Sequence, residues 1–128
     1  MKHWLISFLT VLSFAAYSQS TVTIAFLDKS ILIDGEIDAG WAEAKPISTF
    51  YQLEPNKGNT STRKTIVKTA QFEDRLYFLF ICSINSTNEI AAKIQQRDQL
   101  NMNDDLVSVL LDSYDDNRNA FLFQVNPL

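Results

Sequence analysis

Residues 104–127, DDLVSVLLDSYDDNRNAFLFQVNP, show the clearest structural pattern in the chain. Over 105–112 apolar side chains occupy both alternating faces, which predicts a strand that is covered on both sides. The run 120–125 is rich in residues that fit a pleated sheet, and Pro127 ends it because proline donates no ladder hydrogen bond. Residues 113–119 between them have turn chemistry. The stretch therefore predicts two β-strands joined by an acidic turn.

The sequence before this hairpin predicts further strands. Residues 21–28 alternate as a half-buried strand does, and 63–72 and 76–85 are separated by a connection short enough for a hairpin. Because 76–85 is apolar on both faces, it is expected to be a central strand, with Cys82 as a buried thiol. The run 47–53 is apolar and aromatic, and 54–62 has the composition of a loop.

Two short helical segments complete the pattern. In 36–46 the spacing of Ile37, Trp41 and Ala44 predicts one or two helical turns, with Asp38 as the N-cap. A Ser-Thr-Asn-Glu capping box predicts a second short helix over about 87–96. With six or seven strands in all, the chain is expected to be all-β: an antiparallel, jelly-roll-like β-sandwich with one or two short helical turns.

The chain of 128 residues has room for one domain behind an export signal. Residues 1–18 read as a secretory signal peptide, with a charged Lys2, an apolar run and small residues before the expected cleavage site. That run is shorter than a membrane span, so no transmembrane segment is expected after cleavage. Residues 19–128 would form the sandwich, truncated at its C-terminus because the sequence stops directly after a strand. The protein is expected to be periplasmic, outer-membrane-associated or secreted.

Charge and histidine content exclude several functions. The formal net charge is −4, which argues against nucleic acid as a partner because phosphate binding needs a basic patch. The only histidine, His3, lies in the signal peptide, so the mature chain has no imidazole for a hydrolase triad or a zinc site. No catalytic residue is assigned. A glycosidase-type carboxylate pair is the one enzymatic alternative, and a chain this short is poorly suited to enclose it.

Several motifs together resemble a known family. IDGEIDAGWAEAKPI at 33–47, EPNKG at 54–58, LYFLFIC at 76–82 and the stretch from 97 to 127 resemble carbohydrate-binding module family 9-like domains. The likeness is to those at the N-terminus of exported, hydrolase-like proteins of Bacteroidetes-type bacteria. It implies a β-sandwich that binds sugar chains non-catalytically, with structural calcium in some members, attached to a glycoside hydrolase.

The candidate sugar-binding residues are aromatic or polar and lie mostly in loops: Trp41, Tyr51, Asn56, Lys57 and Tyr114. An aromatic ring can stack on a pyranose, but the position of Trp41 on the apolar face of a helix favours core packing instead. The two tyrosines can equally be half-exposed residues at strand ends. Asp112, Asp115 and Asp116 offer oxygen ligands suited to calcium, with a solvated acidic turn as the alternative.

The sequence therefore predicts a non-catalytic module that binds polysaccharide or oligosaccharide and serves carbohydrate catabolism in an exported parent protein. The alternative is an interaction module that packs on a downstream domain of the same parent. A third and weaker reading is that the chain itself hydrolyses O-glycosyl bonds.

Overall fold

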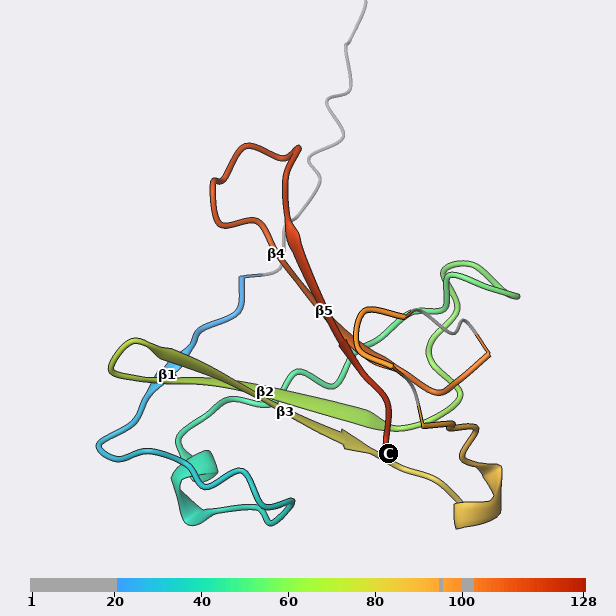
Figure 1. The fold of residues 1–128 in the computed structure, drawn as a ribbon, viewed down its shortest axis with the longest axis horizontal. Coiled ribbons are helices and arrows are strands. Elements are labelled where there is room, and N and C mark those ends of the chain that lie inside the picture. Colours follow the sequence, from blue (N-terminus) through green and yellow to red (C-terminus); the bar gives the residue numbers. More distant parts are fainter. Residues whose placement is uncertain (1–20, 95, 100–102) are drawn as a thin grey trace, which may run out of the picture.

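The computed structural model describes residues 21–94, 96–99 and 103–128. This part of the chain is mostly β, as the sequence predicts, with two short 3-10 helices (Figure 1). In chain order the elements are β1 (Ala25–Phe26), η1 (Ala39–Ala42), β2 (Thr65–Phe72), β3 (Arg75–Cys82), η2 (Thr87–Glu89), β4 (Val107–Leu111) and β5 (Phe121–Val125). No helix within these residues is long and apolar enough to cross a membrane.

The first sheet has the strand order β1-β2-β3. β2 and β3 pair antiparallel over eight residues each, which confirms the predicted hairpin. Glu73 begins the two-residue connection with a φ of 50°. The expected central position of β3 is wrong within the described residues, because β2 is the middle strand and β3 lies at the edge. Apolar residues on both faces of a strand indicate that both faces are shielded from water. They do not indicate that both edges of the strand are paired.

The other edge of β2 is shared by two segments. β1 pairs parallel to it, with Ala25 opposite Ala70, and the Leu27 amide donates to the Gln71 carbonyl at 2.8 Å. Ile47 pairs with Val67 in the antiparallel sense through two hydrogen bonds of 2.8 and 2.9 Å. The sheet is therefore mixed, whereas the sequence predicted antiparallel pairing. The expected strand over 21–28 is reduced to the two residues that reach β2.

The second sheet is the predicted C-terminal hairpin. β4 and β5 pair antiparallel from Val107 opposite Val125 to Leu111 opposite Phe121. In Figure 1 this hairpin runs across the β2–β3 hairpin. The expectation that β4 is covered on both sides is wrong, since Leu110 is 67 % exposed. Within the described residues the structure thus has two sheets, one of three strands and one of two.

The buried core lies on the first sheet. Trp41 is 4 % exposed and clusters with Ala44, Ala70 and Tyr77. Its position follows from η1, where the Ala44 amide donates to the Trp41 carbonyl at 3.3 Å. Lys68 on β2 donates its ammonium to the same carbonyl at 2.7 Å, which fastens the helical turn to the sheet. The core-packing reading of Trp41 is therefore confirmed.

Asp38 occupies the N-cap position of η1, as the sequence predicts, but its side chain does not cap the turn. Its carboxylate instead accepts a hydrogen bond from the Leu32 amide at 3.2 Å. A 3-10 turn of four residues gains little from a cap, so the carboxylate is free to hold the preceding loop. Asp34 and Gly35 form a tight turn before η1, in which Asp34 accepts from the Glu36 amide at 2.9 Å and Gly35 has a φ of 87°.

The helix expected over 87–96 is only the single turn η2. Ser86 accepts from the Asn88 amide at 3.3 Å, as in a capping box, but the Glu89 carboxylate bonds Arg63 instead of turning back to the cap. The next amides are also taken by distant groups. Asp105 accepts from Ala91, and Asp104 accepts from Lys93, both at 2.9 Å. Residue 95 lies outside the described residues.

Candidate functional site

The structure distributes the predicted sugar-binding residues over three places. Trp41 is in the buried core. Tyr51, Asn56 and Lys57 belong to one hairpin and are exposed, the Tyr51 side chain by 66 %. Tyr114, 71 % exposed, is in the β4–β5 connection. Figure 1 shows these two loops on opposite sides of the molecule, so they do not form one site.

The hairpin around Tyr51 is held by its backbone. Tyr51 pairs with Thr60, and the Gln52 amide donates to the Asn59 carbonyl at 2.8 Å. The Gly58 amide closes the tip by donating to the Gln52 carbonyl at 2.9 Å, with a φ of 85° that favours glycine. The hairpin therefore presents an aromatic ring, an amide and an ammonium group on a hydrogen-bonded frame.

The acidic connection between β4 and β5 is organised by two carboxylates. Asp112 accepts from the amides of Asn117 at 2.8 Å, Tyr114 at 3.2 Å and Asp116 at 3.4 Å. These bonds, that from Asn117 foremost, hold the pKa of the Asp112 carboxyl below its ordinary value. The Asp112 side chain thus caps the turn by accepting backbone amides from residues up to five positions further along the chain.

Asp116 repeats the arrangement in the second half of the connection. It accepts from the Asn119 amide at 2.8 Å, from the Asn119 side chain, and from the Arg118 amide at 2.8 Å. The bonds from Asn119 are the main cause of the lowered pKa of Asp116. Within the described residues no group of three or more acidic, cysteine or histidine side chains is placed to hold a metal ion. Backbone amides donate to both Asp112 and Asp116 in this arrangement, and calcium binding at Asp112, Asp115 and Asp116 stays a prediction.

A cleft of about 620 Å³ lies where the two sheets approach each other. Sequence reasoning missed it because its walls come from segments far apart in the chain. Its apolar lining includes Phe80, Ile84, Ile90, Leu106, Val107 and Val125. Such mixed aliphatic lining resembles the interior between two packed sheets.

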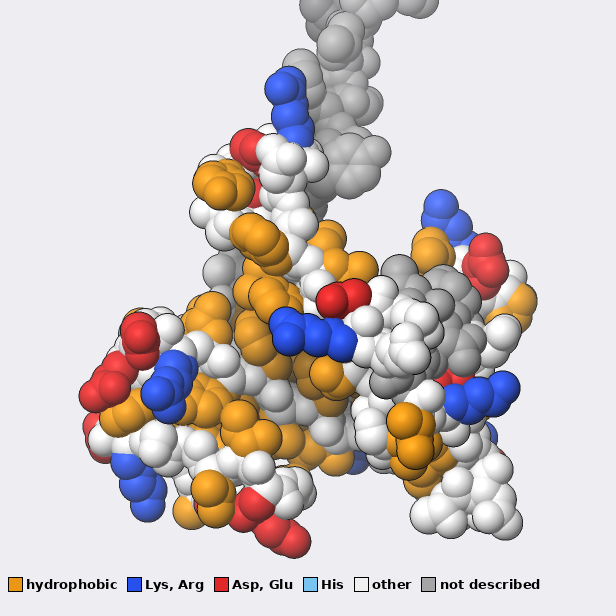
Figure 2. All heavy atoms as spheres, in the orientation of Figure 1, with side chains coloured by type: hydrophobic (Ala, Val, Ile, Leu, Met, Phe, Trp, Pro, Cys, Tyr) orange, Lys and Arg blue, Asp and Glu red, His pale blue; other side chains and the backbone are white. Residues whose placement is uncertain are grey.

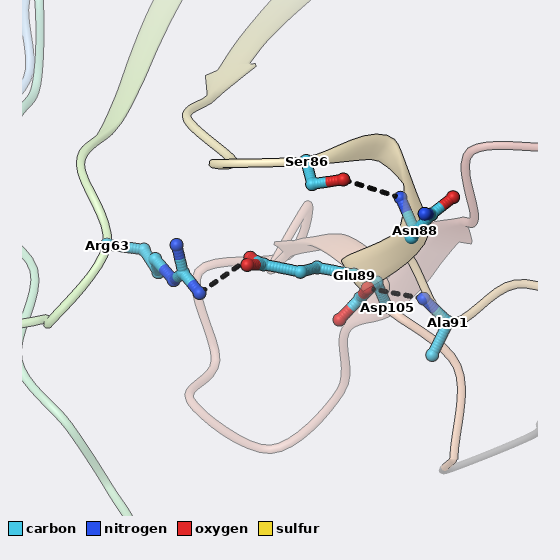
Figure 3. A network of polar contacts seen from close by, with 6 residues as sticks. All are labelled: Arg63, Ser86, Asn88, Glu89, Ala91 and Asp105. Carbon is cyan, nitrogen blue, oxygen red and sulfur yellow. Dashed lines mark hydrogen bonds and ion pairs between the residues drawn. The ribbon is translucent and has the colours of Figure 1, made fainter.

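Polar groups line one wall of the cleft (Figure 3). Arg63, just before β2, forms an ion pair of 2.7 Å with Glu89 on η2, and both side chains are about half exposed. Asp105 accepts from the Ala91 amide and so ties the segment after η2 to the start of β4. Asn126 donates to the Lys93 carbonyl at 2.8 Å. These contacts join the two sheets through the 84–93 segment.

Cys82 ends β3 at this cleft and is exposed. The expectation of a buried thiol is therefore wrong. The apolar run that suggested burial continues to the last residue of the strand, but the last residue lies where the first sheet opens into the cleft.

Apolar side chains are also exposed along β4 and β5 (Figure 2). On β5 the exposed fractions are 55 % for Phe121, 57 % for Phe123 and 63 % for Val125. Contiguous apolar surface of this kind marks places where proteins bind one another.

Comparison of the chain with protein-family models, with curated proteins and with solved structures found no match. Its function is therefore inferred from its own residues and their arrangement.

Proposed function

We propose that this chain is a non-catalytic carbohydrate-binding module of an exported protein that takes part in polysaccharide breakdown. The observation that carries this proposal is the exposed ring of Tyr51 in the same hairpin as Asn56 and Lys57. A flat ring can cover the C–H face of a pyranose, while amide and ammonium groups bond its hydroxyls. Tyr114 and Trp41 lie elsewhere, so the Tyr51 hairpin is the binding surface.

We further propose that the two sheets belong to one jelly-roll-like β-sandwich and that residues 1–18 direct export. The resemblance to family 9-like modules supports both points. The apolar cleft between the sheets also supports the sandwich, since facing sheets are expected to share an apolar interior.

Sugar binding is tested with soluble xylan and cellulose oligosaccharides in calorimetric titrations. We expect saturable binding that Tyr51→Ala weakens by about tenfold, because loss of one stacked ring costs roughly 1–2 kcal/mol. Tyr114→Ala removes an equally exposed tyrosine from the opposite side and should leave the affinity unchanged. Retention of full affinity by Tyr51→Ala, or its loss in Tyr114→Ala, would place the sugar elsewhere.

A second candidate function is docking, as an interaction module that packs on another domain or protein. The observation favouring it is the exposed apolar face of β5. An apolar dye such as 1-anilinonaphthalene-8-sulfonate should bind this face and fluoresce. We expect Phe123→Lys to lower the fluorescence strongly, whereas Phe26→Lys, at a 76 % exposed phenylalanine on the first sheet, should lower it less. Equal losses would argue against a particular docking face on β5.

A further inference from the structure

The outer edge of β5 is open within the described residues. β5 pairs with β4 along one edge, and no backbone hydrogen bond joins the other edge to another described segment. Residues 119–128 carry no charged side chain. Proteins usually protect an open edge with charges, bulges or proline, and here Pro127 follows only after the strand has ended. The edge is thus suited to accept another strand.

Burial changes between the two strands of this hairpin. On one face Val107, Val109 and Leu111 of β4 stand opposite Val125, Phe123 and Phe121 of β5. All three β4 residues are half-buried, while their three β5 partners are exposed. On this face, neighbouring parts of the chain therefore shield β4 but not β5. The exposed apolar side chains of this face lie on β5, next to its open edge.

Charge distinguishes the two ends of β5. The connection that precedes Phe121 contains Asp112, Asp115 and Asp116 with Arg118 as its one basic residue. Aspartate carboxyl groups are ionised at neutral pH, and hydrogen bonds lower the pKa values of Asp112 and Asp116 further. Residues 126–128 at the other end carry no charged side chain, although Asn126 donates to the Asp104 carboxylate at 3.4 Å and to the Lys93 carbonyl at 2.8 Å. A segment lying along β5 would therefore meet the cluster of three acidic side chains at the start of the strand.

We infer that β5 accepts an extended polypeptide segment as an added antiparallel strand. Its alternate apolar side chains cover Phe121, Phe123 and Val125, and its C-terminal end carries lysine or arginine beside the acidic connection. Antiparallel pairing is chosen because its hydrogen bonds are the more stable, and it brings the C-terminus of the segment to the start of β5. This inference rests on the docking function proposed above.

The test uses the whole chain and three synthetic nine-residue peptides, each with a seven-residue alternation of threonine and valine. The first ends in two lysines, the second ends in two glutamates, and the third is the lysine peptide with proline in place of its central valine. We expect the lysine peptide to bind and to slow hydrogen exchange of the β5 amides. The proline peptide should bind about tenfold more weakly, since proline removes a ladder donor. The glutamate peptide should also bind more weakly, and roughly 0.5 M salt should reduce this difference.

Two variants locate the site. Asp115→Asn removes a charge while keeping a residue that tolerates the positive φ of 51°, and it should weaken binding of the lysine peptide only. Phe123→Lys should abolish binding of all peptides, whereas Ile33→Lys, at an 88 % exposed residue of the first sheet's loops, should not. If the proline peptide bound as tightly as its parent and still needed Phe123, docking would stand and strand addition would be wrong. If no peptide bound, strand addition would be wrong. If Phe123→Lys also left the dye fluorescence unchanged, the docking function would be wrong as well.

Discussion

Asp112 shows how a single side chain can set the shape of a loop. Its carboxylate accepts from three backbone amides while remaining exposed. A carboxyl group with a lowered pKa in the folded state contributes stability that is fully present above its ordinary pKa and is lost as the pH falls through the lowered value. The connection should therefore be ordered at neutral pH and loosen below about pH 4.

We expect the amide resonance of Asn117 to shift as the pH is lowered through that range. Its hydrogen exchange should accelerate relative to the intrinsic rate at each pH, because the protecting hydrogen bond to Asp112 is lost. Asp112→Ala should show the accelerated exchange already at neutral pH, because the acceptor is gone. Asp115→Asn is the matched control, since the Asp115 side chain accepts no hydrogen bond within the described residues. Exchange at Asn117 that is identical in wild type and Asp112→Ala would contradict this account.

Calcium is tested at the same residues. Both carboxylates already accept backbone amides, and among the described residues no group of three or more acidic, cysteine or histidine side chains is placed to hold a metal ion. We therefore expect millimolar calcium, or a chelator, to leave the thermal midpoint and the Asn117 amide resonance unchanged. A calcium-dependent rise in the midpoint that Asp116→Asn removes would show that the connection rearranges into a metal site.

Lys68 is the other residue with a distinct structural task. Its ammonium donates to the Trp41 carbonyl at 2.7 Å in a partly buried setting. We expect Lys68→Ala to lower the free energy of unfolding by roughly 1.5–3 kcal/mol, the range typical of a hydrogen bond to a charged group. Urea unfolding followed by Trp41 fluorescence measures it. Lys64→Ala, at an exposed lysine one residue before β2, should cost much less, and equal losses would remove the special role of Lys68.

At the level of elements, sequence patterns correctly predicted those features that depend on residues close together in the chain. Both hairpins were found at the expected places because alternation and turn residues determine them over a few residues. The failures involve partners that are distant in sequence. The helix expected after Ser86 ends after one turn because Asp104 and Asp105 take the amides of Lys93 and Ala91. The sequence near Ser86 contains no pattern that predicts these hydrogen bonds to distant carboxylates.

The same reason explains the candidate site. Tyr51, Asn56 and Lys57 could be grouped from the sequence because a single hairpin holds them. Tyr114 could not be separated from them, since its position depends on how the second sheet crosses the first. Trp41 was correctly favoured for the core because its helical spacing with Ala44 is local.

The Arg63–Glu89 ion pair joins η2 to the segment just before β2 at the cleft. Both side chains are about half exposed, so screening by water limits its contribution. We expect a double-mutant cycle with Arg63→Gln and Glu89→Gln to give a coupling free energy below about 1 kcal/mol, falling further with added salt. A coupling well above that value would mean that the cleft wall is more enclosed in solution.

At the level of the whole molecule, the buried core formed by the described residues is small and confined to one sheet. Trp41, Ala44, Ala70 and Tyr77 cluster between η1 and the β2–β3 hairpin, while the second sheet is a single hairpin with exposed apolar faces. A two-stranded sheet is only marginally stable without packing partners. The two sheets should therefore differ in local stability.

Native-state hydrogen exchange measures that difference. We expect the β2 amides of Val67 and Ala70 to be the most protected, and the β4–β5 amides to exchange much faster through local opening that leaves the first sheet intact. The strand-forming lysine peptide should raise protection of β4 and β5 with little effect on Val67, because it adds a partner to the weaker sheet. Equal protection of both sheets in the free chain would mean that they open together. The cleft contacts made by the 84–93 segment would then couple the sheets more strongly than their exposure implies.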